Sequence, residues 1–148
     1  MGQVVATAEG VVHAPAERVR AALADYEGAR RRMLTEHFSE YRVADGGDGT
    51  VARVQWKLAA TSKRVRDQDL VVSASPDGGL VETDTNSSMV TTWTVQPTEA
   101  GVSTVRVRST WNGAGGIAGF FERTFAPKGL RRIHEGLISR LDAEVSTG

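Results

Sequence analysis

The segment IAGFFERTFAPKGLRRIHEGLISRLDAEV, residues 117–145, decides how the chain must fold, because one straight helix cannot bury both of its apolar stripes. The first stripe consists of Ile117, Phe120, Phe121 and Phe125. The second consists of Leu130, Ile133, Leu137, Leu141 and Val145. The two stripes would lie roughly 150° apart on a straight helix. Pro127 lies between them and has no amide hydrogen, so it predicts a break or a new helix start, with the main helix running from about Pro127 to about Val145.

The chain ahead of this helix has the pattern of one strand, two short helices and six further strands. Valine-rich residues 3–14 predict the first strand, and Pro15 fits the first turn of a helix that ends near Asp25. A second helix is expected over about 26–33. Residues from 36 to 111 follow a period of two, with turn signals between the runs. The predicted strands lie near 36–44, 50–59, 63–74, 79–85, 88–96 and 102–111.

This order predicts an α+β fold with a seven-stranded antiparallel sheet. One hydrophobic face of such a sheet needs a cover, and the long C-terminal helix is the element large enough to supply it. A length of 148 residues fits a single domain over residues 1–148.

Composition excludes several classes of function. The 18 basic and 18 acidic residues cancel, which disfavours nucleic acid as a partner. The absence of cysteine excludes disulfides, a thiolate nucleophile and cysteine-bound metal, and it is compatible with a reducing cytosol. No run approaches 18 apolar residues, and the first residues lack the features of a signal peptide. We therefore expect a cytoplasmic protein without an integral membrane segment.

Three stretches carry a resemblance to a known superfamily: VVHAPAERVRAALADYEG (11–28), GVSTVRVRSTW (101–111) and GLRRIHEGLISRLDAE (129–144). With the order of elements, they resemble bacterial members of the START-like (SRPBCC) superfamily, which includes polyketide cyclases/dehydrases, lipid-transport domains and the birch-pollen allergen type. The resemblance implies a helix-grip fold, in which a curved sheet wraps around the C-terminal helix and leaves a cavity for an apolar ligand. Many bacterial members carry a tryptophan just after the first helix, whereas this chain reads DYEGARRRM (25–33), so its pocket mouth is expected to differ.

Strand parity predicts the ligand site. Trp56, Trp93 and Trp111 each share the phase of neighbouring apolar residues, so their side chains are expected on the covered face, with Thr91 and Ser109 as polar points. The alternative is ordinary core packing. The predicted ligand-binding residues are Trp56, Trp93, Trp111, Met89, Thr91, Phe120, Phe121, Phe125, Leu130 and Ile133. The phenylalanines are expected to close one end of the cavity.

Polar residues give weaker signals. His37 follows the short helices, where members of the superfamily open their pocket, so it is the candidate general base, with a surface histidine as the alternative. Asp67 and Asp69 are expected on a solvated, charge-paired strand face. Arg30, with the two arginines that follow it, is expected on a solvated helix face.

No metal or cofactor is expected. The three histidines lack the spacing of metal ligands, and cysteine is absent. GAGGIA (113–118) matches a loose dinucleotide-binding pattern, but the second parallel strand of such a unit is missing, so a flexible turn is predicted.

Three functions therefore stay open. The first is binding of a hydrophobic or amphipathic small molecule, such as a lipid, a fatty acyl chain or a polyketide-like aromatic. The second is a polyketide cyclase/dehydratase-type enzyme that uses the same pocket. The third is a protein-binding regulator with a collapsed pocket. An open apolar cavity favours the first, convergent ionisable groups inside it favour the second, and a filled core favours the third.

Overall fold

The computed structural model describes residues 3–45, 51–61, 64–112 and 127–146. Its elements are β1 (Gln3–Val12), α1 (Ala16–Ala24), α2 (Ala29–Arg32), β2 (Phe38–Asp45), β3 (Val51–Thr61), β4 (Arg64–Ala74), β5 (Leu80–Asp84), β6 (Val90–Glu99), β7 (Val102–Asn112) and α4 (Pro127–Ser146). The predicted order is confirmed, and each boundary lies within about three residues of its expected position.

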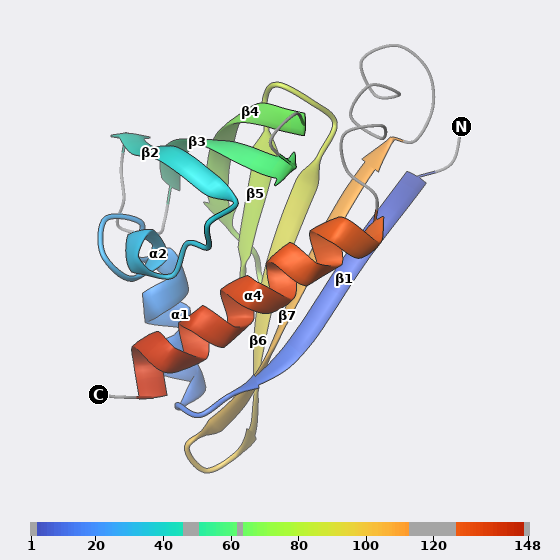
Figure 1. Ribbon diagram of the computed structural model, residues 1–148. Helices are drawn as coiled ribbons and strands as arrows, with labels where there is room; N and C mark the ends of the chain where they lie inside the picture. Colours follow the sequence, from blue (N-terminus) through green and yellow to red (C-terminus); the bar gives the residue numbers. More distant parts are fainter. Residues whose placement is uncertain (1–2, 46–50, 62–63, 113–126, 147–148) are drawn as a thin grey trace.

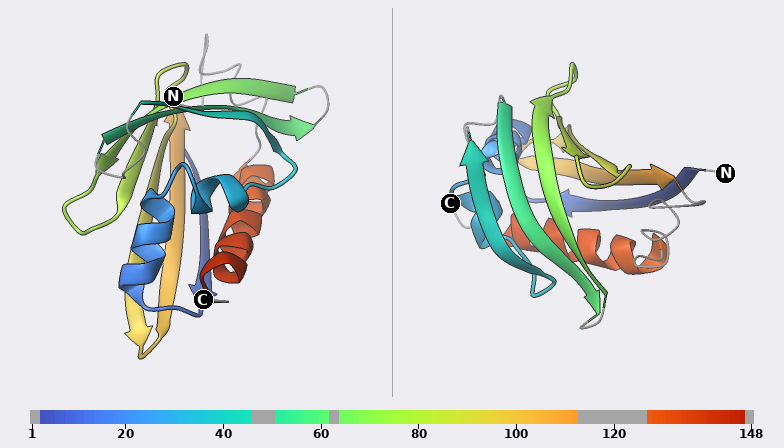
Figure 2. Two further views of the ribbon diagram at one scale, coloured as in Figure 1. Left: turned by 90° about the vertical axis from the view of Figure 1, so that its left-hand side faces the viewer. Right: turned by 90° about the horizontal axis from the view of Figure 1, so that it is seen from above.

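All seven strands form one antiparallel sheet in the order β1-β7-β6-β5-β4-β3-β2. The strands from β2 to β4 run across the direction of β1 and β7, so the sheet curves around α4 (Figures 1 and 2). The short helices α1 and α2 lie near the C-terminal end of α4. This arrangement confirms the helix-grip α+β fold.

The C-terminal helix α4 spans Pro127–Ser146, which agrees with the predicted extent of the main helix. All five residues of its predicted apolar stripe are buried: Leu130, Ile133, Leu137, Leu141 and Val145. His134 and Ile138 widen this buried stripe. Phe120, Phe121 and Phe125 lie outside the described residues, so the change of phase at Pro127 and the aromatic cap remain predictions. No helix in the described ranges is long and apolar enough to cross a membrane.

Helix α4 approaches the sheet most closely at β1. A Cβ atom added to Gly10 would lie 2.8 Å from Cγ2 of Ile138, closer than real side chains approach. A larger residue here would push the helix off the strand. Large side chains occupy the space between α4 and the other strands, except for the cavity described below.

The change Gly10→Ala is expected to lower the free energy of unfolding by about 1–3 kcal/mol, because the added methyl group overpacks a filled interface. Gly129→Ala is the matched control, since a Cβ atom at Gly129 meets nothing within 4 Å and alanine favours helix. Urea denaturation measures both variants. Equal stability of the Gly10 variant and the wild type would show that α4 does not rest on β1 as described.

Candidate functional site

A narrow cavity lies between the inner face of the sheet and α4. Its apolar lining is formed by Leu34, Phe38, Trp56, Leu58, Leu70, Met89, Trp93, Leu130 and Leu137. Its polar lining is formed by Arg30, Gln68, Glu82, Thr91 and His134. About 450 Å³ of this region is free of atoms, part of it open to solvent, but the centre of a water molecule reaches only about 30 Å³. The cavity in this conformation therefore has room for a few waters, not for a lipid.

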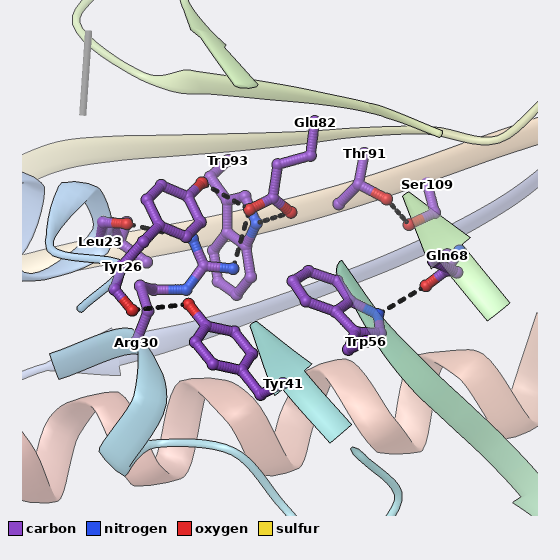
Figure 3. Close-up of polar contacts among 10 residues, drawn as sticks. All are labelled: Leu23, Tyr26, Arg30, Tyr41, Trp56, Gln68, Glu82, Thr91, Trp93 and Ser109. Atoms are coloured by element: carbon purple, nitrogen blue, oxygen red, sulfur yellow. Dashed lines mark hydrogen bonds and ion pairs between the residues drawn. The ribbon is translucent and has the colours of Figure 1, made fainter. Parts of the chain in front are cut away.

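A buried ion pair forms one part of the polar lining. Arg30 Nη2 donates to Glu82 Oε2 at 2.8 Å, and each side chain is less than 5% exposed (Figure 3). The hydroxyl of Tyr26 donates to the same oxygen at 2.6 Å, and the indole nitrogen of Trp93 donates to Oε1 at 3.0 Å. Three donors thus hold the Glu82 carboxylate, which leaves it poorly placed to accept a proton from a ligand.

The Arg30 guanidinium is fixed from several sides. Its Nη1 donates to the carbonyl oxygen of Leu23 at 3.0 Å, and its Cζ lies 4.6 Å from the ring centre of Tyr26 and 5.1 Å from that of Trp93. Burial is the largest single effect and lowers the pKa of Arg30, but the charge and hydrogen bond of Glu82, together with Tyr26 and Tyr41, outweigh it, so the pKa is raised overall. Arg30 therefore stays charged. The expectation that Arg30 lies on a solvated helix face is wrong, because α2 turns this side chain inward to Glu82.

Two tyrosines next to this pair stay protonated. Burial is the main cause that raises the pKa of Tyr26 well above its usual value and also raises the pKa of Tyr41. The Tyr41 hydroxyl donates to the carbonyl oxygen of Tyr26 at 2.7 Å, and its ring stacks on Trp56 with 6.0 Å between ring centres. Both hydroxyls therefore act as hydrogen-bond donors that stiffen the cavity wall.

Strand register explains how two further polar contacts arise. Trp56 on β3 lies opposite Gln68 on β4, and its indole nitrogen donates to Gln68 Oε1 at 2.8 Å. Thr91 on β6 lies opposite Ser109 on β7, and their hydroxyl oxygens are 2.7 Å apart. Both pairs are buried on the inner face, where unpaired polar groups would be costly.

His134 on α4 extends the second pair into a chain of three. Its Nε2 lies 2.8 Å from Ser109 Oγ. Burial lowers the pKa of His134 to about 4, against a smaller opposing effect of the Glu82 charge, so the ring is neutral near pH 7. Its other nitrogen, Nδ1, is buried and has no hydrogen-bond partner in the described structure. The neutral ring can therefore still accept or donate one hydrogen bond.

The structure brings some of the predicted ligand-binding residues to the cavity. Five of them line it: Trp56, Met89, Thr91, Trp93 and Leu130. Trp111 and Ile133 are buried but are not among the lining residues. The three phenylalanines lie outside the described residues. Whether a ligand contacts any of these side chains remains a prediction.

His37 does not line the cavity. It is half-buried, and its Nδ1 lies 3.0 Å from the hydroxyl oxygen of Thr35. Asp69 forms a two-bond pair with Arg53 across β3 and β4, in line with the expected charge-paired strand face, and these hydrogen bonds hold the pKa of Asp69 below its usual value. In the described part of the chain, no three histidine or carboxylate side chains gather as a metal site.

Sequence reasoning missed Glu82, Gln68 and His134 as cavity residues, although a signal for each was present. Glu82 shares the inward phase of Leu80 on β5, and Gln68 shares that of Leu70 on β4. His134 lies four residues after Leu130, inside the apolar stripe of α4. A polar residue at an inward position is informative because it requires a partner.

Known proteins match this chain over almost its full length. The family model described as polyketide cyclase / dehydrase and lipid transport matches residues 3–146. The solution structure of the KanY protein is 44% identical and covers 99% of each chain, with a TM-score of 0.88. A START superfamily protein from Mycobacterium smegmatis is 11% identical and covers 99% of each chain, with a TM-score of 0.70. The Zhui aromatase/cyclase from Streptomyces sp. R1128 is 16% identical, and the match covers 97% of this chain and 88% of the Zhui chain, with a TM-score of 0.62. The last two likenesses show the fold alone, and no curated protein matches.

Proposed function

Because the chain belongs to the polyketide cyclase / dehydrase and lipid transport family, we propose that it binds an amphipathic small molecule between the sheet and α4. The lining of the cavity is the observation that supports this function most directly. Among the described residues, nine apolar side chains line the space, and polar groups such as His134 and Thr91 converge on it. A mostly apolar wall with a few placed polar groups is typical of small-molecule sites.

The narrow cavity requires that binding widen it. Leu34 and Phe38 line the cavity and are only half-buried, so they mark the side at which it can open with the least loss of packing. Both follow the segment 25–33, in which the sequence differs from many bacterial members of the superfamily. We propose that a ligand enters past these two side chains.

A cyclase or dehydratase is the second candidate, because three ionisable side chains line the cavity. Arg30 and Glu82 neutralise each other, however, and Glu82 accepts three hydrogen bonds. Among these three, His134 has a hydrogen-bonding atom without a partner in the described ranges. Proton transfer usually needs an acid and a base in reach of the substrate, so binding is favoured over catalysis. A cytoplasmic location, and a protein-binding role with a collapsed pocket, stay predictions from the sequence.

The change Leu34→Trp tests the binding function. The larger ring is expected to fill the mouth of the cavity and to weaken binding of the neutral probe N-phenyl-1-naphthylamine by about tenfold or more, since overpacking typically costs about 1–3 kcal/mol. Probe fluorescence, excited where tryptophan does not absorb, gives the dissociation constant.

The matched control is Val71→Trp, which adds the same ring at an exposed position on β4. This variant is expected to bind the probe as the wild type does. Equal affinity of the Leu34 variant and the wild type would place the probe outside the cavity. If the wild type fails to bind the probe, the ligand-binding function is wrong and the regulator with a collapsed pocket is favoured.

A further inference from the structure

Within the described ranges, one nitrogen of the buried His134 ring has a hydrogen-bond partner and the other has none. Nε2 lies 2.8 Å from the Ser109 hydroxyl, which in turn lies 2.7 Å from the hydroxyl of Thr91. These contacts come from three different elements, α4, β7 and β6, and they fix the orientation of the ring. Nδ1 is buried and has no hydrogen-bond partner in the described ranges. Nearly all buried polar atoms in native proteins have a partner, so this nitrogen needs one from beyond the described residues.

Within the described ranges, the cavity beside the ring of His134 is a place where that partner can lie. The ring lines the cavity together with Leu130 and Leu137, which lie one turn away on either side of it on α4. The neutral form of the ring is favoured there, because burial disfavours the imidazolium. The other polar side chains of the lining already pair with protein groups, so an uncharged hydrogen-bonding group is what the partner must complement.

We propose that Nδ1 of His134 is the hydrogen-bonding contact for a hydroxyl group of the ligand. The ligand class is then a neutral alcohol or phenol on an apolar skeleton. This inference rests on the proposed binding function and adds the polar group that the ligand must carry.

A hydroxyl fits better than the other common polar groups. The Ser109 hydroxyl can either donate to Nε2 or accept from it, so Nδ1 is a donor in one tautomer of the ring and an acceptor in the other. A hydroxyl pairs with both tautomers, whereas a carbonyl oxygen pairs only with the donor. A ligand carboxylate would be only weakly attracted to Arg30, because the charge of Glu82, 2.8 Å away, cancels that of Arg30.

Two probes of nearly equal shape test the proposal. 2-Naphthol carries a hydroxyl where 2-methylnaphthalene carries a methyl group, so their affinities differ by what the hydroxyl contributes beyond the methyl group it replaces. We expect the wild type to bind 2-naphthol about tenfold or more tightly, because an otherwise unpaired buried nitrogen gains a partner. Competition by 1-decanol, with decane as the control that lacks the hydroxyl, then shows whether an aliphatic alcohol or a phenol is the preferred source of the hydroxyl.

Two variants assign the preference to one nitrogen. The amide of glutamine reaches the position of Nε2, so His134→Gln keeps a partner for Ser109 and removes Nδ1. The amide of asparagine lies at the position of Nδ1, so His134→Asn has the opposite effect. The expected result is that the preference for 2-naphthol disappears in the Gln variant and persists in the Asn variant. Any other pattern across the two variants overturns the assignment to Nδ1.

The outcomes separate this inference from the proposed function. If the wild type binds neither naphthalene, the binding function fails and the inference fails with it. If the wild type binds both probes equally, the binding function stands and the hydroxyl contact is wrong. The same result is expected when water alone satisfies Nδ1. Imidazole nitrogen-15 NMR of the wild type needs no variant: 2-naphthol should shift the Nδ1 resonance and 2-methylnaphthalene should not. Equal shifts with both probes would overturn the proposal even if neither variant folds.

Discussion

Replacing Glu82 by glutamine is expected to lower the free energy of unfolding by about 3–5 kcal/mol at pH 7. The substitution keeps the shape of the side chain, and the amide oxygen can still accept a hydrogen bond. It removes the negative charge that compensates Arg30, whose side chain is 4% exposed. A buried cation without a counterion is costly, and the pKa of Arg30 is too high for the cation to lose its proton instead. Urea denaturation followed by far-UV circular dichroism measures the loss.

The control is Asp69→Asn, which makes the same change from carboxylate to amide in the more exposed pair with Arg53. That variant is expected to lose less than about 1 kcal/mol, because water screens the pair. A loss at Glu82 no larger than the loss at Asp69 would show that the Arg30–Glu82 pair is hydrated in solution.

Acidification from pH 7 to pH 5 is expected to remove about 2 kcal/mol of stability through His134 alone. Burial lowers the pKa of His134 to about 4 in the folded chain, whereas a histidine in an unfolded chain titrates near 6.5. Between these values the unfolded chain binds a proton that the folded chain does not bind, so stability rises with pH. The contribution is complete above about pH 6.5 and is lost as the pH falls toward 4.

Comparison with His134→Gln isolates this contribution, since glutamine does not titrate and all other groups are shared. Urea denaturation at pH 7, 6 and 5 gives the slope for each protein. All three pH values lie above the range in which Asp69 takes up protons, because the pKa of Asp69 lies below its usual value. Parallel slopes for the wild type and the variant would mean that the imidazole of His134 is accessible to water and protonates normally.

Most of the fold could be predicted from the sequence because its signals are local. Turn residues separate runs of period two, and the apolar stripe from Leu130 to Val145 has the period of a helix, so neither depends on distant parts of the chain. Parity also placed Trp56, Trp93 and Trp111 inside, and all three are buried. The curvature of the sheet and the cavity were implied by the family resemblance, not by these patterns.

The polar half of the site could not be predicted in the same way, because it depends on contacts between distant elements. Arg30 lies in a run of three arginines on a four-residue helix, where no periodicity marks one side chain as buried. Its burial goes with its ion pair to Glu82 on β5, 52 residues later in the sequence. Strand parity could have identified Glu82 as an inward carboxylate, but not its partner. The same is true of His134 and Ser109.

The pairing of β1 with β7 also has a kinetic consequence. It joins residues near the start of the described chain to residues about 100 positions later, from Gln3 opposite Asn112 to Val12 opposite Ser103. The meander from β2 to β7 can form by short hairpin closures, whereas β1 must close a loop that contains the whole meander, at a greater entropic cost. Because α4 rests on β1 at Gly10, the helix gains its closest support only after this closure. The sheet is thus expected to assemble before the helix docks, and the two sides of the cavity meet in the last step of folding.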